Sequence, residues 1–254
     1  MSEKVSNPRG WPIVEVCDPS GRRGLHIIWA AVDPEDYWYV VWAARVPPGA
    51  FSEMAKGVKA ERKMLPHEPD LCIMDARGGA FQVDMETRET FFDRFRQFGL
   101  LYVPSVQQSE TMDADIANLR DWLMPRYHPV SDRSISKLRF TRSVANMKEG
   151  PLWALQTFVW DPHKQTKAWH YKQKSKDFVD CMRYLTGYPG LTYRRFQNQT
   201  DPSVYRGNSL AESYRRPRLA GDARANRQTL GIRNGAPMGY RAAWNMRRRG
   251  GGLS

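Results

Sequence analysis

Residues 11–42 read WPIVEVCDPSGRRGLHIIWAAVDPEDYWYVVW, and this stretch decides the fold. It contains three short runs of β-branched and aromatic residues, at 11–17, 26–32 and 37–42, which are separated by DPSG and DPED. β-Branched and aromatic residues favour strands, whereas aspartate, proline, serine and glycine are typical of turns. The stretch therefore predicts three antiparallel strands in a meander.

After the meander, helical and strand patterns alternate as far as about residue 190. The patterns predict helices at 51–64, 86–98, 113–124, 144–155 and 176–186, and further strands at 71–75, 100–106 and 138–141. A crossover between parallel strands is right-handed, which places strand 71–75 beside strand 11–17. We therefore expect a mixed α/β fold with a five-stranded sheet of order 3-2-1-4-5, in which strand 2 is antiparallel and helices cover both faces.

Positive charge is concentrated at the C-terminal end of the chain. The 254 residues include 39 Lys and Arg and 27 Asp and Glu, which gives a net charge of +12. Residues 201–254 contain eleven arginines and three acids, and so carry eight of these charges. Because this segment has few aliphatic residues to bury, we expect an N-terminal extension (1–10), a folded domain (11–200) and a disordered Arg/Gly-rich tail (201–254). Such a basic chain is typical of proteins that bind a polyanion, most often nucleic acid.

The composition also excludes several classes of protein. No uncharged apolar run approaches 18 residues, and the N-terminus lacks the apolar core of a signal peptide, so neither a membrane span nor secretion is expected. Cys17, Cys72 and Cys181 are scattered without a CxxC pair and indicate neither a disulfide framework nor a zinc site. We expect a soluble cytoplasmic protein with no membrane partner.

Aspartates at the strand ends are candidates for a metal site. Asp18 and Asp75 end the first and fourth predicted strands, which lie side by side about 4.8 Å apart, so their carboxylates point into one cleft. Asp177 and Asp180 share one edge of the last predicted helix, from which Asp180 supplies a third carboxylate. Such an oxygen-rich site suits Mg²⁺ or Mn²⁺, and two ions about 4 Å apart activate water and stabilise the leaving oxygen in phosphodiester hydrolysis. Any one of these aspartates alone is more simply a turn residue or a solvated acid; their coincidence favours the site.

Basic residues near these aspartates are the expected nucleic-acid contacts. Arg22, Arg23 and Arg77 follow the two strand-terminal aspartates. Segment 161–176 interleaves lysines with aromatic residues, a pattern that holds a phosphate backbone or stacks an unpaired base. Its candidate contacts are Lys164, Lys167, Lys172 and Lys174. A β-hairpin with solvated lysines is an equally good interpretation of the segment.

Several of these features together resemble one known family. They are Asp18-Pro19-Ser20-Gly21 after a strand, the hairpin 27–42, Ile73-Met74-Asp75-Ala76 before a loop, the helix 91–99 before a strand, and the helix segment 177–185. Over residues 11–190 the chain resembles the C-terminal nuclease domain of tailed-phage terminase large subunits, which belongs to the ribonuclease-H-like superfamily. The resemblance implies that Asp18, Asp75 and Asp180 bind the metal ions, that Asp177 is an auxiliary ligand, and that the chain cuts double-stranded DNA to end genome packaging.

The chain also departs from the family pattern. Gly21-Arg22-Arg23-Gly24 stands where many relatives have a further acid, and Arg77-Gly78-Gly79 follows Asp75 where Ser-Gly is commoner. No segment matches GxxxxGKS or GxxxxGKT, so the phosphate-binding loop of the packaging ATPase is missing. We therefore expect a nuclease domain alone, as an excised domain or a separate gene product. The partners that the resemblance implies are a packaging ATPase, a small terminase subunit and the portal.

Two alternative functions are compatible with the same residues. One is a non-catalytic module that binds nucleic acid or docks within a packaging complex, and it would bind DNA without binding metal. The other is a different ribonuclease-H-like nuclease, such as a junction resolvase or an RNA–DNA hybrid nuclease, which would differ in the substrate that it cuts.

Overall fold

The computed structural model describes residues 10–20, 23–80, 89–106, 112–128, 131–158 and 176–197. Its helices are α1 (Phe51–Arg62), α2 (Ala76–Gly79), α3 (Phe91–Gln97), α4 (Met112–Leu123), α5 (Arg142–Ala145), α6 (Pro151–Thr157), α7 (Lys176–Gly187) and α8 (Tyr193–Gln197). Its strands are β1 (Ile13–Ser20), β2 (Gly24–Val32), β3 (Trp38–Val46), β4 (Leu71–Met74), β5 (Val103–Pro104), β6 (Arg126–His128), β7 (Arg133–Ile135) and β8 (Leu138–Phe140). Several predictions lie outside the described residues, namely most of the N-terminal extension, the tail 201–254, Arg22, and the basic segment with Lys164, Lys167, Lys172 and Lys174.

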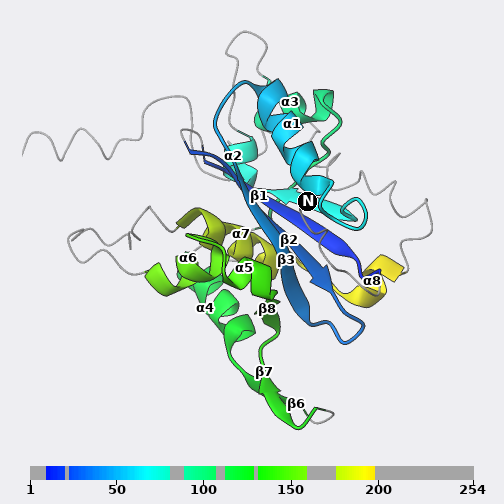
Figure 1. The fold of residues 1–254 in the computed structure, drawn as a ribbon, viewed down its shortest axis with the longest axis vertical. Helices are drawn as coiled ribbons and strands as arrows, with labels where there is room; N and C mark the ends of the chain where they lie inside the picture. The colour runs from blue at the N-terminus through cyan, green and yellow to red at the C-terminus, as the bar shows by residue number, and fades with distance from the viewer. Residues whose placement is uncertain are drawn as a thin grey trace, which may run out of the picture. The chain divides into compact units, whose positions relative to one another are not determined.

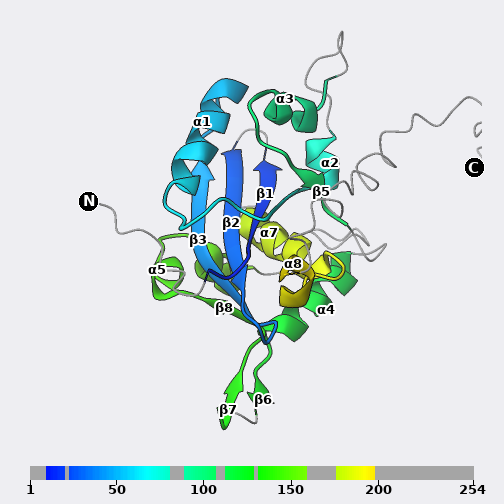
Figure 2. The ribbon, with the colours of Figure 1, turned by 90° about the vertical axis from the view of Figure 1, so that its right-hand side faces the viewer.

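A six-stranded sheet organises the domain (Figures 1 and 2). Its order is β5-β4-β1-β2-β3-β8, in which β2 is antiparallel to β1 and β3 and all other neighbours are parallel. The predicted order of the first five strands and the antiparallel second strand are therefore confirmed. The sixth strand, β8, is the short strand predicted near 138–141, and it adds to the edge beside β3.

The first strand is longer than predicted. The sequence predicts that it ends at Cys17 and that Asp18 begins a turn, whereas β1 runs to Ser20 and pairs with β2 throughout. Proline has no backbone N–H, so it fits a strand only where no neighbouring strand needs that donor. The pairing of β1 with β4 ends at Cys17 and Met74, and Pro19 comes after this point in the described sheet. Asp18 therefore lies inside a strand, and its pairing with β2 fixes its direction.

Other differences from the predictions have local causes. The predicted helix 144–155 is two helices, α5 and α6, because Glu149 has a φ of 52° and Pro151 begins a new helix. The strand predicted at 100–106 shortens to β5. The sequence does not predict α2, α8 or the β6–β7 hairpin, since these elements of three to five residues are too short for a periodic pattern.

Helices cover both faces of the sheet, as predicted: α1 and α3 lie on one side of the strands, and α4 to α7 lie on the other (Figure 1). On one face Val14 and Val16 of β1 share a core with residues of α4, α5, α6 and α7. On the other face Ile13 and Cys17 share a core with residues of α1 and α3. Since side chains alternate along a strand, Asp18 points to the face that α7 covers. Among the described helices, none is long and apolar enough to cross a membrane.

Candidate functional site

Asp18 and Asp75 lie beside each other where β1 and β4 end their pairing. Cys17 of β1 pairs with Met74 of β4, and Asp75 donates its backbone N–H to the Cys17 carbonyl at 3.1 Å. Adjacent strands are about 4.8 Å apart, so the two aspartates that follow this pair occupy neighbouring positions. Asp18 is buried. The structure thus places the buried Asp18 carboxylate and the Asp75 carboxylate side by side, where the pairing of β1 and β4 ends.

The two oxygens of Asp75 have different surroundings. Asp75 is the N-cap of α2, and its Oδ2 accepts the Gly78 backbone N–H at 2.7 Å. A Cβ atom at Gly78 would lie 2.7 Å from Pro19 Cγ and 3.0 Å from this Oδ2, so the close approach requires glycine. Oδ1 is buried and has no hydrogen-bond partner within the described part of the chain. A buried carboxylate oxygen without a donor is costly unless a cation or water satisfies it.

Helix α7 brings two further aspartates to the same face. Asp177 and Asp180 are both buried, although they are charged residues of the first turns of the helix. The Cys181 thiol donates to the His26 carbonyl at 3.2 Å, which fixes this part of α7 against β2. Since His26 pairs with Asp18 in the β1–β2 ladder, the same contact holds Asp180 close to Asp18.

Each oxygen of Asp180 has its own cation. Oδ1 accepts a hydrogen bond from Arg183, a buried guanidinium that also donates to Asp115 of α4 at 3.0 Å. Oδ2 lies 3.3 Å from Nζ of Lys176, whose side chain is 39% exposed. Asp115 lies in the first turn of α4, and it supplies the second carboxylate that the buried Arg183 needs.

Asp177 lies at the rim of the group. Its Oδ2 is 3.0 Å from a guanidinium nitrogen of Arg23, which is partly exposed, and it also accepts a hydrogen bond from Ser20. The His26 Nδ1 atom is 3.5 Å from the same oxygen, but it makes no hydrogen bond and stays unsatisfied within the described structure. Burial, together with the charges of Arg45 and Arg23, lowers the pKa of His26 to about 4, so this imidazole is neutral at pH 7.

The four aspartates form one electrostatic unit, which we call the aspartate cluster (Asp18, Asp75, Asp177 and Asp180). Burial raises the pKa of Asp18 well above its ordinary value, and the negative charges of Asp180, Asp177 and Asp75 raise it further. Burial also raises the pKa values of Asp177 and Asp180, and the positive charge of Lys176 opposes the shift at both. Carboxylates that disfavour one another's charge in this way are stabilised by a bound cation.

The donor chemistry of the aspartate cluster fits a hard divalent cation. Carboxylate oxygens are the ligands that Mg²⁺ and Mn²⁺ prefer, and Asp75 Oδ1 has no other partner among the described residues. The described side chains are not positioned around a common metal site, however. In the described ranges, no group of three or more His, Cys, Asp or Glu residues is arranged to hold a metal ion. Side-chain cations instead neutralise two of the carboxylates, at Asp177 and Asp180.

The other predicted site residues are divided between this region and the undescribed part. Arg23 joins the aspartate cluster as the partner of Asp177, whereas Arg77 is exposed on α2. Arg183 is not among the predicted site residues, although an arginine three residues after an aspartate on an amphipathic helix is a signal for such a pair. No comparable signal identifies Asp115, because it lies 68 residues from Arg183 in the chain.

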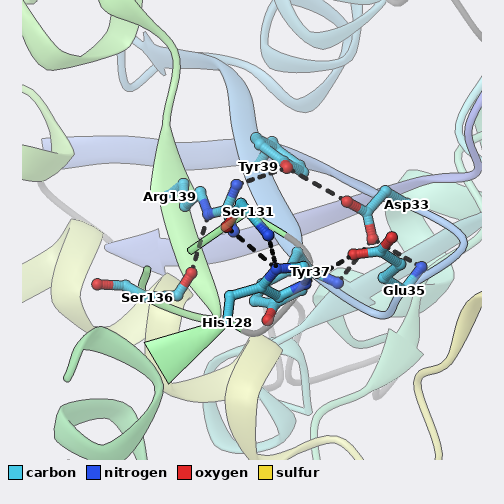
Figure 3. Close-up of polar contacts among 8 residues, drawn as sticks. All are labelled: Asp33, Glu35, Tyr37, Tyr39, His128, Ser131, Ser136 and Arg139. Atoms are coloured by element: carbon cyan, nitrogen blue, oxygen red, sulfur yellow. Dashed lines mark hydrogen bonds and ion pairs between the residues drawn. The ribbon is translucent and has the colours of Figure 1, made fainter. Parts of the chain in front are cut away.

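A second polar cluster lies at the other end of β2 and β3, where the β6–β7 hairpin meets their connecting turn (Figures 1 and 3). His128 Nε2 lies 3.0 Å from Glu35 Oε2, and Arg139 donates to the Tyr39 hydroxyl at 2.8 Å. Asp33 accepts from two backbone N–H groups of the turn and from Tyr39, which confirms its predicted role as a turn residue. The contact of His128 with Glu35 attaches the hairpin to the turn between β2 and β3, and the contact of Arg139 with Tyr39 joins β8 to β3.

Comparison with known proteins identifies the fold. No protein-family model matches the chain, and no curated protein matches it. The large terminase from a thermophilic bacteriophage, solved in complex with ADP, is similar at 14% identity and a TM-score of 0.50, over 70% of this chain and 40% of that one. The chain has a ribonuclease-H-like fold, which it shares with part of this terminase.

A second solved structure is similar over more of its own length. The nuclease domain of the P22 large terminase matches at 14% identity and a TM-score of 0.49, over 77% of this chain and 87% of that domain. The chain thus spans about two fifths of the thermophilic phage terminase and most of the P22 nuclease domain.

Proposed function

We propose that the chain is a metal-dependent endonuclease of the terminase type that cuts double-stranded DNA. The observation that supports this most strongly is the aspartate cluster, which forms where β1, β4 and α7 meet in a ribonuclease-H-like fold. Bringing four carboxylates together, three of them buried, lowers stability, because the buried ones must be desolvated and the charges repel one another. A catalytic role accounts for an arrangement that folding alone disfavours.

Asp18, Asp75 and Asp180 are the proposed ligands, and Asp177 is an auxiliary one. A bound Mg²⁺ or Mn²⁺ supplies an activated water and stabilises the charge that develops on the phosphate and on the leaving oxygen, and two ions share these tasks in phosphodiester hydrolysis. The residues of the chain orient the ligands beforehand: the α2 backbone holds Asp75, and Arg183 holds Asp180. Such support keeps ligand carboxylates in position without reorganisation.

Basic residues around the aspartate cluster are the proposed contacts to the DNA backbone. Arg23 and Arg77 border the cluster, and four predicted contacts lie between α6 and α7 in the chain, namely Lys164, Lys167, Lys172 and Lys174. Contacts of this kind depend on the charge of the phosphates and not on the base sequence, so DNA binding should weaken steeply as the salt concentration rises. In a packaging setting, the proposed partners are a packaging ATPase, a small terminase subunit and the portal.

A second candidate function is a non-catalytic module that binds nucleic acid within a packaging complex. The observation that favours it is the set of ion pairs that Asp177 and Asp180 make with Arg23, Arg183 and Lys176. If these pairs persist in solution, the cluster is a neutralised structural network and binds no metal. Calorimetry with Mn²⁺ separates the two functions, since DNA binding without metal binding belongs to the second.

A cleavage assay on the full chain tests the proposed activity. With Mn²⁺, the wild-type protein should nick and linearise supercoiled plasmid, and Asp75→Asn should lower the rate about a hundredfold or more, because it weakens a metal ligand. Asp121→Asn changes an exposed aspartate of α4 and is the matched control, which should cut like the wild type. Equal cleavage rates for Asp75→Asn and the wild type would show that Asp75 is not a catalytic metal ligand. Duplex, four-way and RNA–DNA hybrid substrates in the same assay distinguish a terminase-type enzyme from a resolvase or a hybrid nuclease.

A further inference from the structure

Lys176 reaches most of the aspartate cluster with a single positive charge. Its Nζ lies 3.3 Å from Asp180 Oδ2. Burial raises the pKa values of Asp18 and Asp177, and the charge of Lys176 counteracts the shift at both of them. One ammonium group therefore partly neutralises three of the four carboxylates.

The stability of α7 does not account for a lysine at this position. Lys176 is the first described residue of α7, and a positive charge at a helix N-terminus is disfavoured by the helix dipole. In an i, i+4 pair, a lysine that precedes the acid is also the weaker of the two orders. The carboxylates that surround Lys176, and not the helix, therefore explain its place.

The two cations on Asp180 differ in their freedom to leave. Arg183 is buried and is held from the other side by Asp115, so its departure would remove a cation that two buried carboxylates share. Lys176 is partly exposed, and its ammonium is a compact, strongly hydrated charge on a flexible stem. Moving this ammonium from Asp180 into water completes its hydration, so Asp180 has one permanent partner and one that can be removed.

We propose that Lys176 is a placeholder for the metal ion: its ammonium neutralises the aspartate cluster in the metal-free protein, and a divalent cation displaces it from Asp180 Oδ2. This inference rests on the proposed function and adds a regulatory step to the same site. The placeholder role explains why the aspartate cluster has the donor chemistry of a metal site, although no three of the described residues are arranged as metal ligands. The displaced ammonium stays at the edge of the cluster, where it meets an anionic phosphodiester.

Metal affinity of the full chain provides the first test. In isothermal titration calorimetry with Mn²⁺, Lys176→Met should bind about fivefold more tightly than the wild type, because a competing, partly exposed ion pair no longer has to be broken. Lys176→Arg keeps the charge and should not bind more tightly than the wild type. Lys56→Met removes an exposed lysine of α1, on the opposite face of the sheet, and should bind Mn²⁺ like the wild type.

Displacement itself is visible at the lysine side chain. In spectra of protein with ¹³C-labelled lysine, the Lys176 resonance is assigned by its absence in Lys176→Met. During a Mg²⁺ titration it should move to the values of a solvated lysine, with the midpoint that calorimetry with Mg²⁺ gives. If the wild type binds Mg²⁺ while this resonance stays in place, or if Lys176→Met binds Mn²⁺ no more tightly, the placeholder role is overturned and the nuclease proposal stands. If neither protein binds a divalent cation at millimolar concentrations, the nuclease proposal fails and the placeholder role fails with it.

Discussion

Removing the Arg183 guanidinium should lower the free energy of unfolding by more than the loss of a surface ion pair does. Arg183 joins Asp180 of α7 to Asp115 of α4, and the three side chains are 6%, 5% and 10% exposed. Arg183→Met keeps most of the volume and removes the cation that Asp115 and Asp180 share, so that Asp180 keeps only the partly exposed Lys176. Breaking a buried pair from one side costs about 3–5 kcal/mol, which for a domain of this size corresponds to roughly 10 °C in melting temperature.

The pH dependence of this loss identifies its cause. Burial already raises the pKa of Asp180, and loss of the Arg183 charge raises it further. A carboxyl group whose pKa is higher in the folded than in the unfolded state binds a proton more tightly in the folded state. The free energy of unfolding therefore rises as the pH falls from the pKa of the folded state towards the ordinary value of 3.8. The variant gains more from acidification than the wild type does. The difference between them should therefore be smaller at pH 5 than at pH 7.

Urea unfolding at pH 7 and pH 5, followed by circular dichroism, measures both effects. Arg126→Met is the matched control, since it breaks an exposed pair with Asp121 and should cost less than about 1 kcal/mol. A loss below about 1 kcal/mol for Arg183→Met, or a loss of the same size at both pH values, would contradict the account of this buried network.

Three further predictions concern the surroundings of the aspartate cluster. Gly24→Ala should destabilise the protein by about 2 kcal/mol or more in urea unfolding, because Gly24 has a φ of +81° and a Cβ atom there would lie 2.0 Å from the Val46 carbonyl oxygen; an unchanged midpoint would contradict this close approach. Mn²⁺ affinity measured by calorimetry should fall as pH is lowered from 7 to 5, since Asp18 has a raised pKa and its protonated form cannot bind the ion; constant affinity would exclude Asp18 as a ligand. The imidazole of His26 should titrate near pH 4 in an NMR pH series, and a midpoint near 6.5 would show that it is solvated.

The sheet was predictable because its signals are local. The runs around Val14, Ile28 and Val40 are β-branched and are separated by turn residues, and the right-handed crossover rule then places the strand at Ile73 beside the first one. The same step puts Asp18 and Asp75 on adjacent strands. The sequence misses the extension of β1 through Pro19, because whether a proline is compatible with a strand depends on where the neighbouring strand ends.

The partners of the aspartates could not be predicted in the same way. Arg183 reaches Asp115 across 68 residues of chain, and no periodicity reports such a contact. Lys176 was one of several lysines in a basic segment, and only the folded helix shows that its ammonium lies beside Asp180. Composition and spacing therefore indicate the acids of a site, whereas the cations that neutralise those acids depend on how α4 and α7 pack.

The most direct test of a metal-binding aspartate cluster is a crystal of the full chain soaked in Mn²⁺ and measured for anomalous scattering. We expect anomalous peaks within about 2.5 Å of carboxylate oxygens of Asp18, Asp75 and Asp180. Peaks elsewhere, or none at the cluster while Arg23 and Lys176 keep their ion pairs, would contradict this expectation.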